Sequence, residues 1–195
     1  SGTFVLTVTS INDAPIIELI ENQEMDEDTI LDLSLSATDI DVDDQLTFTA
    51  EGNEFINVDV LENILTIAPI ANYNGSATIS VTVSDGNIDD LTSFTVTVNP
   101  VNDAPTLDEL VDDSVNEDEE YTLELSANDI DEDSLTFEAS VDGNGSVSVE
   151  GTTLTIIPSD DYNGDINVFV EAQDEGGLSD SGTFVLTVIP INDAP

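Results

Sequence analysis

The stretch ISVTVSDGNIDDLTSFTVTVNPVNDAP, residues 79–105, decides the fold of this chain. Apolar residues alternate with polar ones along residues 77–83 and again along 93–98, and the turn pair Asp85-Gly86 lies between these runs. A period of two places the apolar side chains on one face of a β-strand. The stretch therefore predicts two half-buried strands joined by a turn.

The same pattern returns once per 90 residues. Asn12-Asp13-Ala14-Pro15 recurs at 102–105 and at 192–195, and residues 1–15 match residues 181–195 at every position except 9 and 10. Such a period indicates a tandem array. We expect residues 1–11 to be the last strand of a preceding repeat, 12–101 and 102–191 to be two modules, and 192–195 to start the next linker.

Each repeat contains further runs with the strand period. Apolar residues alternate with polar ones at Leu31, Leu33, Leu35 and Ala37, and the same alternation occurs at residues 121–127 of the second repeat. Other strands are expected at 46–50, 64–67, 135–139, 154–157, 166–172 and 183–188. About seven short strands per module, with turns between them, indicate an all-β antiparallel sandwich.

The charge is extreme. The 195 residues include 44 acids and no Lys, Arg or His, which gives a net charge of -44. This excludes nucleic acid and anionic membrane as partners, because both need basic side chains to replace counterions. Cysteine is absent, so disulfides and thiolate metal sites are excluded. No apolar run reaches the roughly 18 residues of a membrane span. Cations must neutralise the carboxylates.

Acidic residues recur in register at several loops. Asp39 and Asp41 lie in the loop 39–44, and the second repeat has Asp129 and Asp131. Calcium takes 6–8 oxygen ligands, more than one loop supplies, and the loops of a sandwich gather at its two ends. The other recurring oxygen donors are Glu27 and Glu117, Asp85 and Asp174, and the pairs Asn12-Asp13, Asn102-Asp103 and Asn192-Asp193. The alternative interpretation is that these acids are solvated residues of loops and turns and do not bind an ion.

These motifs carry a family resemblance. The stretch 79–105, residues 166–195 and SLSATDIDVDD at 34–44 resemble parts of a cadherin repeat, and together with NYNG at 72–75 and DYNG at 161–164 they resemble the bacterial cadherin-like tandem repeats of large surface adhesins. The resemblance implies two tandem antiparallel Greek-key β-sandwich modules of the cadherin or immunoglobulin-like kind. It also implies bound Ca²⁺ at the module junctions.

The resemblance assigns each donor to a junction. Between the repeats it places Glu27, Asn102, Asp103, Asp129, Asp131 and Asp174. Upstream it places Asn12, Asp13, Asp39, Asp41 and Asp85, and downstream Glu117, Asn192 and Asp193. The linker 99–103 has fewer acids than cadherin linkers, and 72–74 and 161–163 replace the cadherin Asp-Arg-Glu motif. Fewer ions than the three of a cadherin junction are therefore expected.

The resulting functional hypothesis is a calcium-rigidified spacer in a long extracellular adhesin at the bacterial cell surface, of the kind that supports biofilms. Its partners would be neighbouring repeats of the same chain. The alternative is a module that binds polysaccharide or like modules on another cell. Catalysis is not expected, because without His, Cys or Lys only a carboxylate pair could act as acid and base.

Three smaller predictions concern aromatic and apolar side chains. Tyr73 and Tyr162 precede closing strands, where a tyrosine commonly bonds to backbone. Phe169 falls on the polar phase of its strand and is expected to be exposed. Phe4, Leu6 and Val8 alternate like a core-facing strand, so this segment is expected to pack on a neighbouring molecule.

Overall fold

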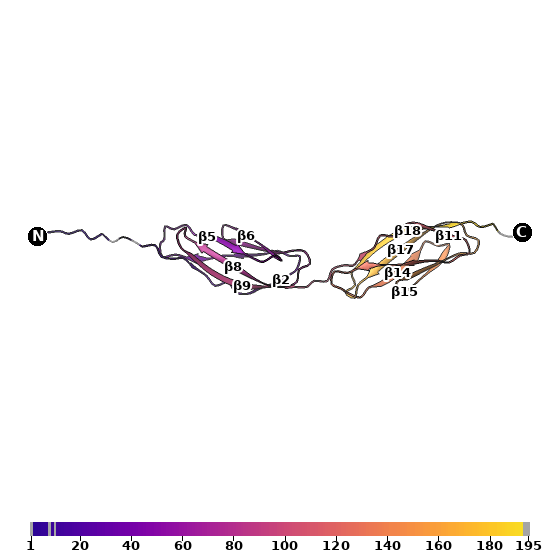
Figure 1. The fold of residues 1–195 in the computed structure, drawn as a ribbon, viewed down its shortest axis with the longest axis horizontal. Helices are drawn as coiled ribbons and strands as arrows, with labels where there is room; N and C mark the ends of the chain where they lie inside the picture. Colours follow the sequence, from indigo (N-terminus) through magenta and orange to yellow (C-terminus); the bar gives the residue numbers. More distant parts are fainter. Residues whose placement is uncertain (1, 8, 10, 193–195) are drawn as a thin grey trace. The chain divides into compact units, whose positions relative to one another are not determined.

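The computed structural model of the chain describes residues 2–7, 9 and 11–192. It divides into two compact units, Ser1–Val101 (unit 1) and Asn102–Pro195 (unit 2). Throughout the described ranges every regular element is a β-strand (Figure 1). In that same part of the chain, no helix with the length and apolarity of a membrane span occurs.

Unit 1 is a sandwich of two sheets. The larger sheet has the order β2-β9-β8-β5 and the smaller one β3-β7-β6, while β1 pairs with β4. The strands are β1 (Ile16–Ile17), β2 (Gln23–Asp26), β3 (Leu31–Ser34), β4 (Ala37–Thr38), β5 (Thr47–Glu51), β6 (Ile56–Leu61), β7 (Ile64–Pro69), β8 (Gly75–Ser84) and β9 (Asp89–Asn99). All pairs are antiparallel except β2 with β9, which is parallel.

Unit 2 repeats this topology with the sheets β11-β18-β17-β14 and β12-β16-β15 and the pair β10-β13. Its parallel pair is β11 with β18. The strands are β10 (Thr106–Leu107), β11 (Asp113–Asn116), β12 (Tyr121–Glu124), β13 (Ala127–Asn128), β14 (Thr136–Val141), β15 (Gly145–Glu150), β16 (Thr153–Pro158), β17 (Gly164–Gln173) and β18 (Ser179–Ile189).

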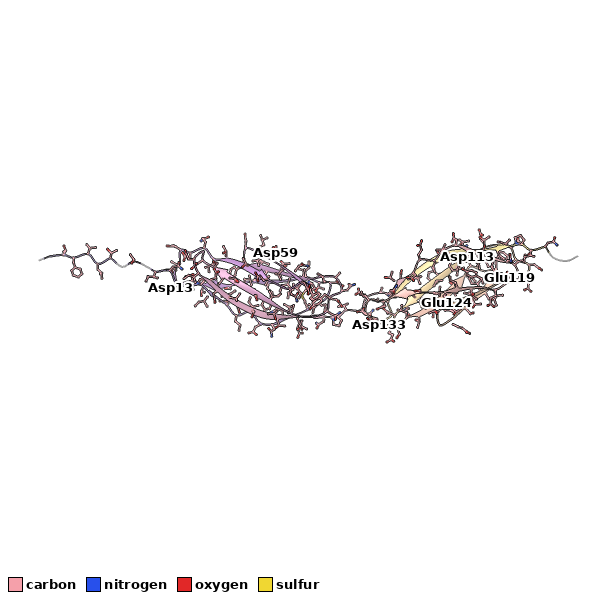
Figure 2. The ribbon with its side chains drawn as sticks, in the orientation of Figure 1. Asp13, Asp59, Asp113, Glu119, Glu124 and Asp133 are labelled. Atoms are coloured by element: carbon pink, nitrogen blue, oxygen red, sulfur yellow. The ribbon has the colours of Figure 1, made fainter. Side chains whose placement is uncertain are left out.

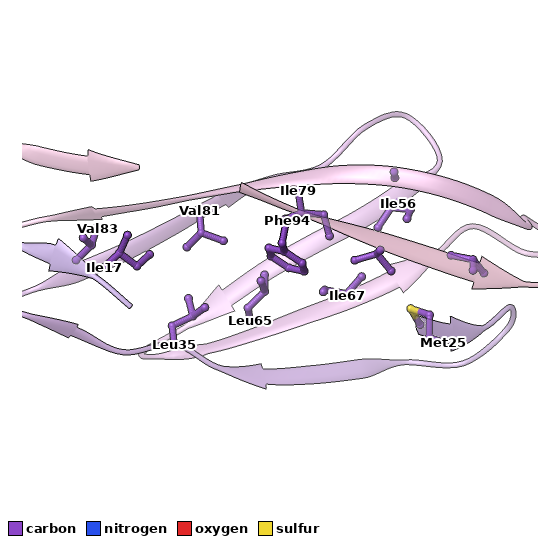
Figure 3. Close-up of a cluster of buried hydrophobic side chains, with 13 residues drawn as sticks. Ile17, Met25, Leu35, Ile56, Leu65, Ile67, Ile79, Val81, Val83 and Phe94 are labelled. Atoms are coloured by element: carbon purple, nitrogen blue, oxygen red, sulfur yellow. The ribbon is translucent and has the colours of Figure 1, made fainter. Parts of the chain in front are cut away.

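The core of each unit is made by the inward-facing residues of both sheets. In unit 1, Leu65 and Ile67 of β7 lie opposite Ile79 and Val81 of β8, and Phe94 of β9 lies among them (Figure 3). These side chains are essentially removed from solvent. Complete burial of one aliphatic side chain contributes about 1.5–3 kcal/mol, so two modules of this size fold without disulfides or metal-thiolate sites.

The all-β sandwich fold predicted from the sequence is confirmed, and the predicted strands agree with the observed ones to within a few residues at each end. One prediction is wrong in detail, because residues 31–37 do not form a single strand. Residues 35 and 36 lie in no strand, although the N–H of Leu35 still donates to Asn63 O at 2.7 Å, one step beyond the last β3–β7 pair. The chain then changes partner, so that β3 pairs with β7 whereas β4 pairs with β1.

The two tyrosines take the predicted corner position. Tyr162 Oη donates to Asp165 O at 2.9 Å, and Tyr73 Oη makes a longer contact of 3.5 Å with Ser76 O. The predicted last strand of a preceding repeat has no pairing among residues 2–7 and 9; Phe4 and Leu6 are exposed there, and Val8 lies outside the described residues. Its packing on another molecule stays a prediction.

Candidate metal centre

Polar side chains from three segments of unit 1 meet at the end of the sandwich where the chain enters. They come from the linker before β1, the loop between β4 and β5, and the turn between β8 and β9. Asn12 Nδ2 donates to Asp85 Oδ2 at 2.8 Å, and the backbone N–H of Asp13 donates to Asp41 Oδ2 at 2.8 Å. Asp41 N–H in turn donates to Asp39 Oδ1 at 2.9 Å. Hydrogen bonds thus hold all five predicted upstream residues together.

Three carboxylates in this end of unit 1 are close enough to share a cation. One oxygen each of Asp39, Asp41 and Asp44 lies within 4.8 Å of the others, and all three residues are half-buried. Asp39 Oδ2 and Asp44 Oδ2 are buried without a hydrogen-bond partner. A buried oxygen of this kind costs free energy unless a donor or ion satisfies it. Three anionic oxygens at one point suit a hard cation such as Ca²⁺.

Unit 2 repeats the hydrogen bonds of this end with equivalent residues, but among the described residues only unit 1 brings three carboxylate oxygens within 4.8 Å of one another. Asn102 Nδ2 donates to Asp174 Oδ2 and Asp103 N–H to Asp131 Oδ2, both at 2.8 Å. Asp129 Oδ1 accepts the N–H of Asp131 at 2.8 Å, while its Oδ2 is buried without a partner. The loop that carries Asp133 lies at one end of the unit (Figure 2). Five of the six residues predicted for the junction are therefore brought together within unit 2.

The pKa values of the carboxylates at the entry ends are shifted in different directions. Partial burial, followed by the charges of Asp41 and Asp39, raises the pKa of Asp44. Burial and the Asp129 charge likewise raise the pKa of Asp133. Asp85 behaves oppositely, because the N–H of Ile88 and the Asn12 side chain lower its pKa. A bound cation would offset the burial and the neighbouring negative charges that raise these two pKa values.

The pKa of Asp174 is lowered although burial alone would raise it. Hydrogen bonds from the Asn102 side chain and from the Leu178 and Gly177 backbone outweigh that burial. Asp85 and Asp174 are therefore held ionised by protein donors and present a fixed negative charge to the site.

Asp44 and Asp133 were missed by the sequence prediction. It selected alternate acids of the loop, Asp39 with Asp41 and Asp129 with Asp131, because alternation directs side chains to one side. The loop instead turns back at Asp44, whose N–H donates to Asp41 O at 3.0 Å. Asp44 and Asp133 occupy the same position relative to the strand that follows each loop, β5 or β14. A search that aligned the two loops on the start of that strand would have found both residues.

The two predicted glutamates lie elsewhere in their units, next to the last strand. Glu27 is 2% exposed, and its Oε1 accepts the N–H of Val101 at 2.8 Å while its Oε2 is buried without a hydrogen-bond partner. Glu117 Oε1 accepts the N–H of Ile191 at 2.6 Å. Each carboxylate thus holds the segment that leaves its module.

Two parts of the predicted sites stay predictions. The grouping of Glu27 with the acids of residues 129–174 would join unit 1 to unit 2. In the downstream set, Asn192 is described and follows Ile191, but Asp193 lies outside the described residues, as does the rest of the predicted linker 193–195.

Comparison with known proteins identifies a family model in two copies. The model described as a bacterial Ig domain matches residues 12–99 and again 102–187. No curated protein gives a significant match.

Solved structures of similar fold include cadherin ectodomains. Human protocadherin-24 EC1-2 matches with a TM-score of 0.58 and 16% identity over 94% of this chain and 100% of that one. The human desmocollin-1 ectodomain gives 0.54 and 19% over 92% and 41%, and Drosophila N-cadherin EC1-4 gives 0.52 and 17% over 93% and 50%. The chain spans 29% of an endo-fucoidan hydrolase that it matches with a TM-score of 0.41. At these identities the likeness is one of fold.

Proposed function

The chain belongs to the bacterial Ig domain family, and from this premise we propose that its two modules are calcium-stiffened spacers of a long extracellular adhesin. The observation that carries the proposal is the group of Asp39, Asp41 and Asp44, whose oxygens converge within 4.8 Å. Two of these carboxylates have a buried oxygen without a hydrogen-bond partner. In a chain with no basic residue, a cation is the natural counter-charge.

Calcium would be held at the entry end of each module. In unit 1 the first ligands would be Asp39, Asp41 and Asp44, with Asp85 and the linker pair Asn12 and Asp13 beside them. Ca²⁺ takes 6–8 oxygens in flexible geometry, so water or a neighbouring module would supply the rest. The bound ion would supply positive charge, and the residues themselves fix the loop and linker through the hydrogen bonds described above.

Glu27 would connect one module to the next. Its Oε1 is bonded to the N–H of Val101, and Val101 is followed directly by the ligand pair Asn102 and Asp103. Its other oxygen is buried without a partner. We propose that this oxygen ligates the ion of the following module, so that carboxylates of both modules share one cation. Without the ion these charges repel each other and the linker is free to bend.

The proposed setting follows from this chemistry. Calcium is abundant outside cells, and the total absence of Lys and Arg leaves no site for trypsin-like proteases. We therefore propose a location at the bacterial surface, where the modules would hold an adhesive domain away from the cell. Their direct partners would be adjacent repeats, and no catalytic role is proposed for them.

Thermal unfolding in calcium, in magnesium and in chelator, at equal ionic strength, tests whether the modules bind calcium at specific sites. Calcium at about a hundred times its dissociation constant should stabilise by about 2.7 kcal/mol per site. We expect a raised midpoint in calcium and little change in magnesium, which demands stricter octahedral geometry. Equal effects of the two salts would mean simple screening of acids and would reject the site.

Distance measurements between one spin label in each unit test the stiffening. Calcium should narrow the distribution of label distances, and Glu27→Gln should restore much of its width. Glu117→Gln is the matched control, because it alters the equivalent contact on the far side of unit 2. A distribution that is equally broad with and without calcium contradicts the spacer proposal even if calcium binds.

A further inference from the structure

The outward face of the large sheet of unit 2 carries a shallow pocket. It has a volume of about 230 Å³, and its lining includes Ser140, Asp142, Asn167, Phe169 and Thr183. These residues come from or follow β14, β17 and β18, which lie side by side in the sheet (Figure 1). The pocket is separate from the acidic end of the module, since none of the proposed calcium ligands lines it.

Phe169 forms the apolar part of this pocket. It is 39% exposed, whereas its neighbours Val168 and Val170 point into the core and are fully buried. In the strand register Phe169 lies between Ser140 of β14 and Thr183 of β18. An aromatic ring that contributes little to the core is thus flanked on both sides by hydroxyl groups, each of which can donate and accept.

A rigid polar pair borders the ring. Asn167 Nδ2 donates to Asp142 Oδ2 at 2.6 Å, and the backbone N–H of Asn167 donates to Asp142 Oδ1 at 3.2 Å. The N–H of Asp142 donates back to Asn167 O at 3.2 Å. These three bonds fix a planar carboxylate and a planar amide before any ligand arrives, which lowers the entropy cost of binding.

We propose that this pocket binds a single neutral sugar ring, a role beyond that of a spacer. A pyranose has an apolar C–H face that can lie on Phe169 and a rim of hydroxyls that can bond to Ser140, Thr183 and Asp142. The pocket is smaller than the roughly 300–1,000 Å³ of sites for drug-sized ligands, which fits one ring. Anionic sugars are disfavoured, because Asp142 and the net charge of -44 repel them.

Unit 1 lacks this combination and supplies the control. Ser80 stands at the place of Phe169, between Glu51 of β5 and Ser93 of β9. Since unit 1 folds with serine at that position, Phe169→Ser should leave the fold of unit 2 intact. The thermal midpoint of unit 2 should therefore stay close to that of the unsubstituted chain.

Amide NMR of the two-module chain, titrated with methyl β-D-glucopyranoside and methyl β-D-galactopyranoside in calcium buffer, tests the site. We expect fast-exchange shifts at Asn167, Phe169 and Thr183 with at least one of them at millimolar concentrations. Phe169→Ser should weaken binding by about 2–10-fold, and Phe169→Tyr should retain it. Ser80→Phe should not create a site in unit 1, because the Asp142–Asn167 pair has no equivalent there.

Four outcomes overturn the proposal. They are no shifts with either glycoside up to about 100 mM, shifts spread evenly over both units, an affinity that Phe169→Ser leaves unchanged, and a stronger response to methyl β-D-glucuronide. Shifts at Phe169 that depend on protein concentration without sugar would assign the face to a second copy instead. The spacer proposal stands or falls separately, because its readouts are calcium-induced stability and distance.

Discussion

The two units are most alike at the end where the chain enters and least alike on the outward face of the large sheet. At the entry end, the bond of Asn12 to Asp85 and that of Asn102 to Asp174 are both 2.8 Å long. On the outward face, β8 presents only hydroxyls and β17 presents a mixture. These residues are Ser76, Thr78, Ser80, Thr82 and Ser84 in β8, and Asp165, Asn167, Phe169, Glu171 and Gln173 in β17.

This comparison distinguishes residues that both modules share, at the entry end, from residues that differ between them, on the outward face of the large sheet. Residues at the entry end bond to the linker, to each other and, as proposed, to an ion, so a change at one affects the others. Outward residues of a strand touch mainly their cross-strand neighbours. Unit 2 can therefore carry Phe169 at no cost to its core, and unit 1 can carry serine there.

The largest expected effect lies in the core, where the units should respond equally. Phe94 and Phe184 occupy equivalent positions on β9 and β18 and are 3% and 2% exposed. Replacing either by alanine should cost its own unit about 3–5 kcal/mol, because a cavity replaces a buried ring. Calorimetry should show one transition lowered and the other unmoved. Loss of both transitions together would show that the units do not fold independently.

A smaller effect is expected where the units differ, at Tyr121. Its Oη donates to Asp113 Oδ2 at 3.2 Å, whereas unit 1 has Leu31 and Gln23 at the equivalent positions. Tyr121→Phe should destabilise unit 2 by about 1 kcal/mol and leave unit 1 unchanged. Tyr162→Phe is the control for the loss of a tyrosine hydroxyl, because it removes the hydrogen bond from Tyr162 Oη to the backbone oxygen of Asp165 instead.

The same tyrosine makes unit 2 sensitive to alkali. Burial, then the Asp113 charge, raises the pKa of Tyr121 to about 12. A raised pKa in the folded state means that stability is complete below the ordinary value of 10.0 and is lost as the pH rises through about 12. Near-ultraviolet absorbance should show one of the three tyrosines titrating late, and titration of all three together would contradict this.

The smallest effect is expected from the acids at the entry ends, measured in chelator. Because the pKa values of Asp44 and Asp133 are raised, their contribution to stability is present below the ordinary value of 3.8 and is lost as the pH rises through their folded-state pKa. Asp44→Asn should flatten this decline for unit 1 only. Asp59→Asn, an exposed acid on β6, is the charge-matched control and should change neither unit's profile.

The sequence was sufficient for the long strands in which apolar residues alternate without interruption, whereas β6 and β15 alternate over shorter runs and were not predicted. The runs along β8, β9, β17 and β18 have a period of two, and burial of one face leaves no other element for them to form. The short strands β2 and β11 were not predicted, since QEMD and DSVN contain no clear apolar alternation. They exist because the last strand offers a free edge, a tertiary condition that local pattern does not contain.

The candidate metal centre could be predicted in kind but not in each ligand. Repetition at a fixed period selected Asp39, Asp41 and Asp85, and unit 1 brings these residues together. The identity of Asp44 as the third carboxylate depends on how the loop turns, which its spacing does not determine. Phe169 was correctly expected to be exposed, but its pocket depends on Ser140 and Thr183, which only the strand register brings beside it.

The parallel pairing of β2 with β9 has a mechanical consequence. If unit 1 is pulled by its two ends, tension reaches β2 from its start and β9 from its end, in opposite directions. The hydrogen bonds that link Gln23–Asp26 to residues 96–99 then lie across the line of force, so they are loaded together in shear rather than opened one at a time. Resistance to force is set by the unfolding rate, and once the two-residue β1–β4 pair has opened, this short ladder is the clamp that has to rupture. The array would then bear tension through one small patch of backbone in each module.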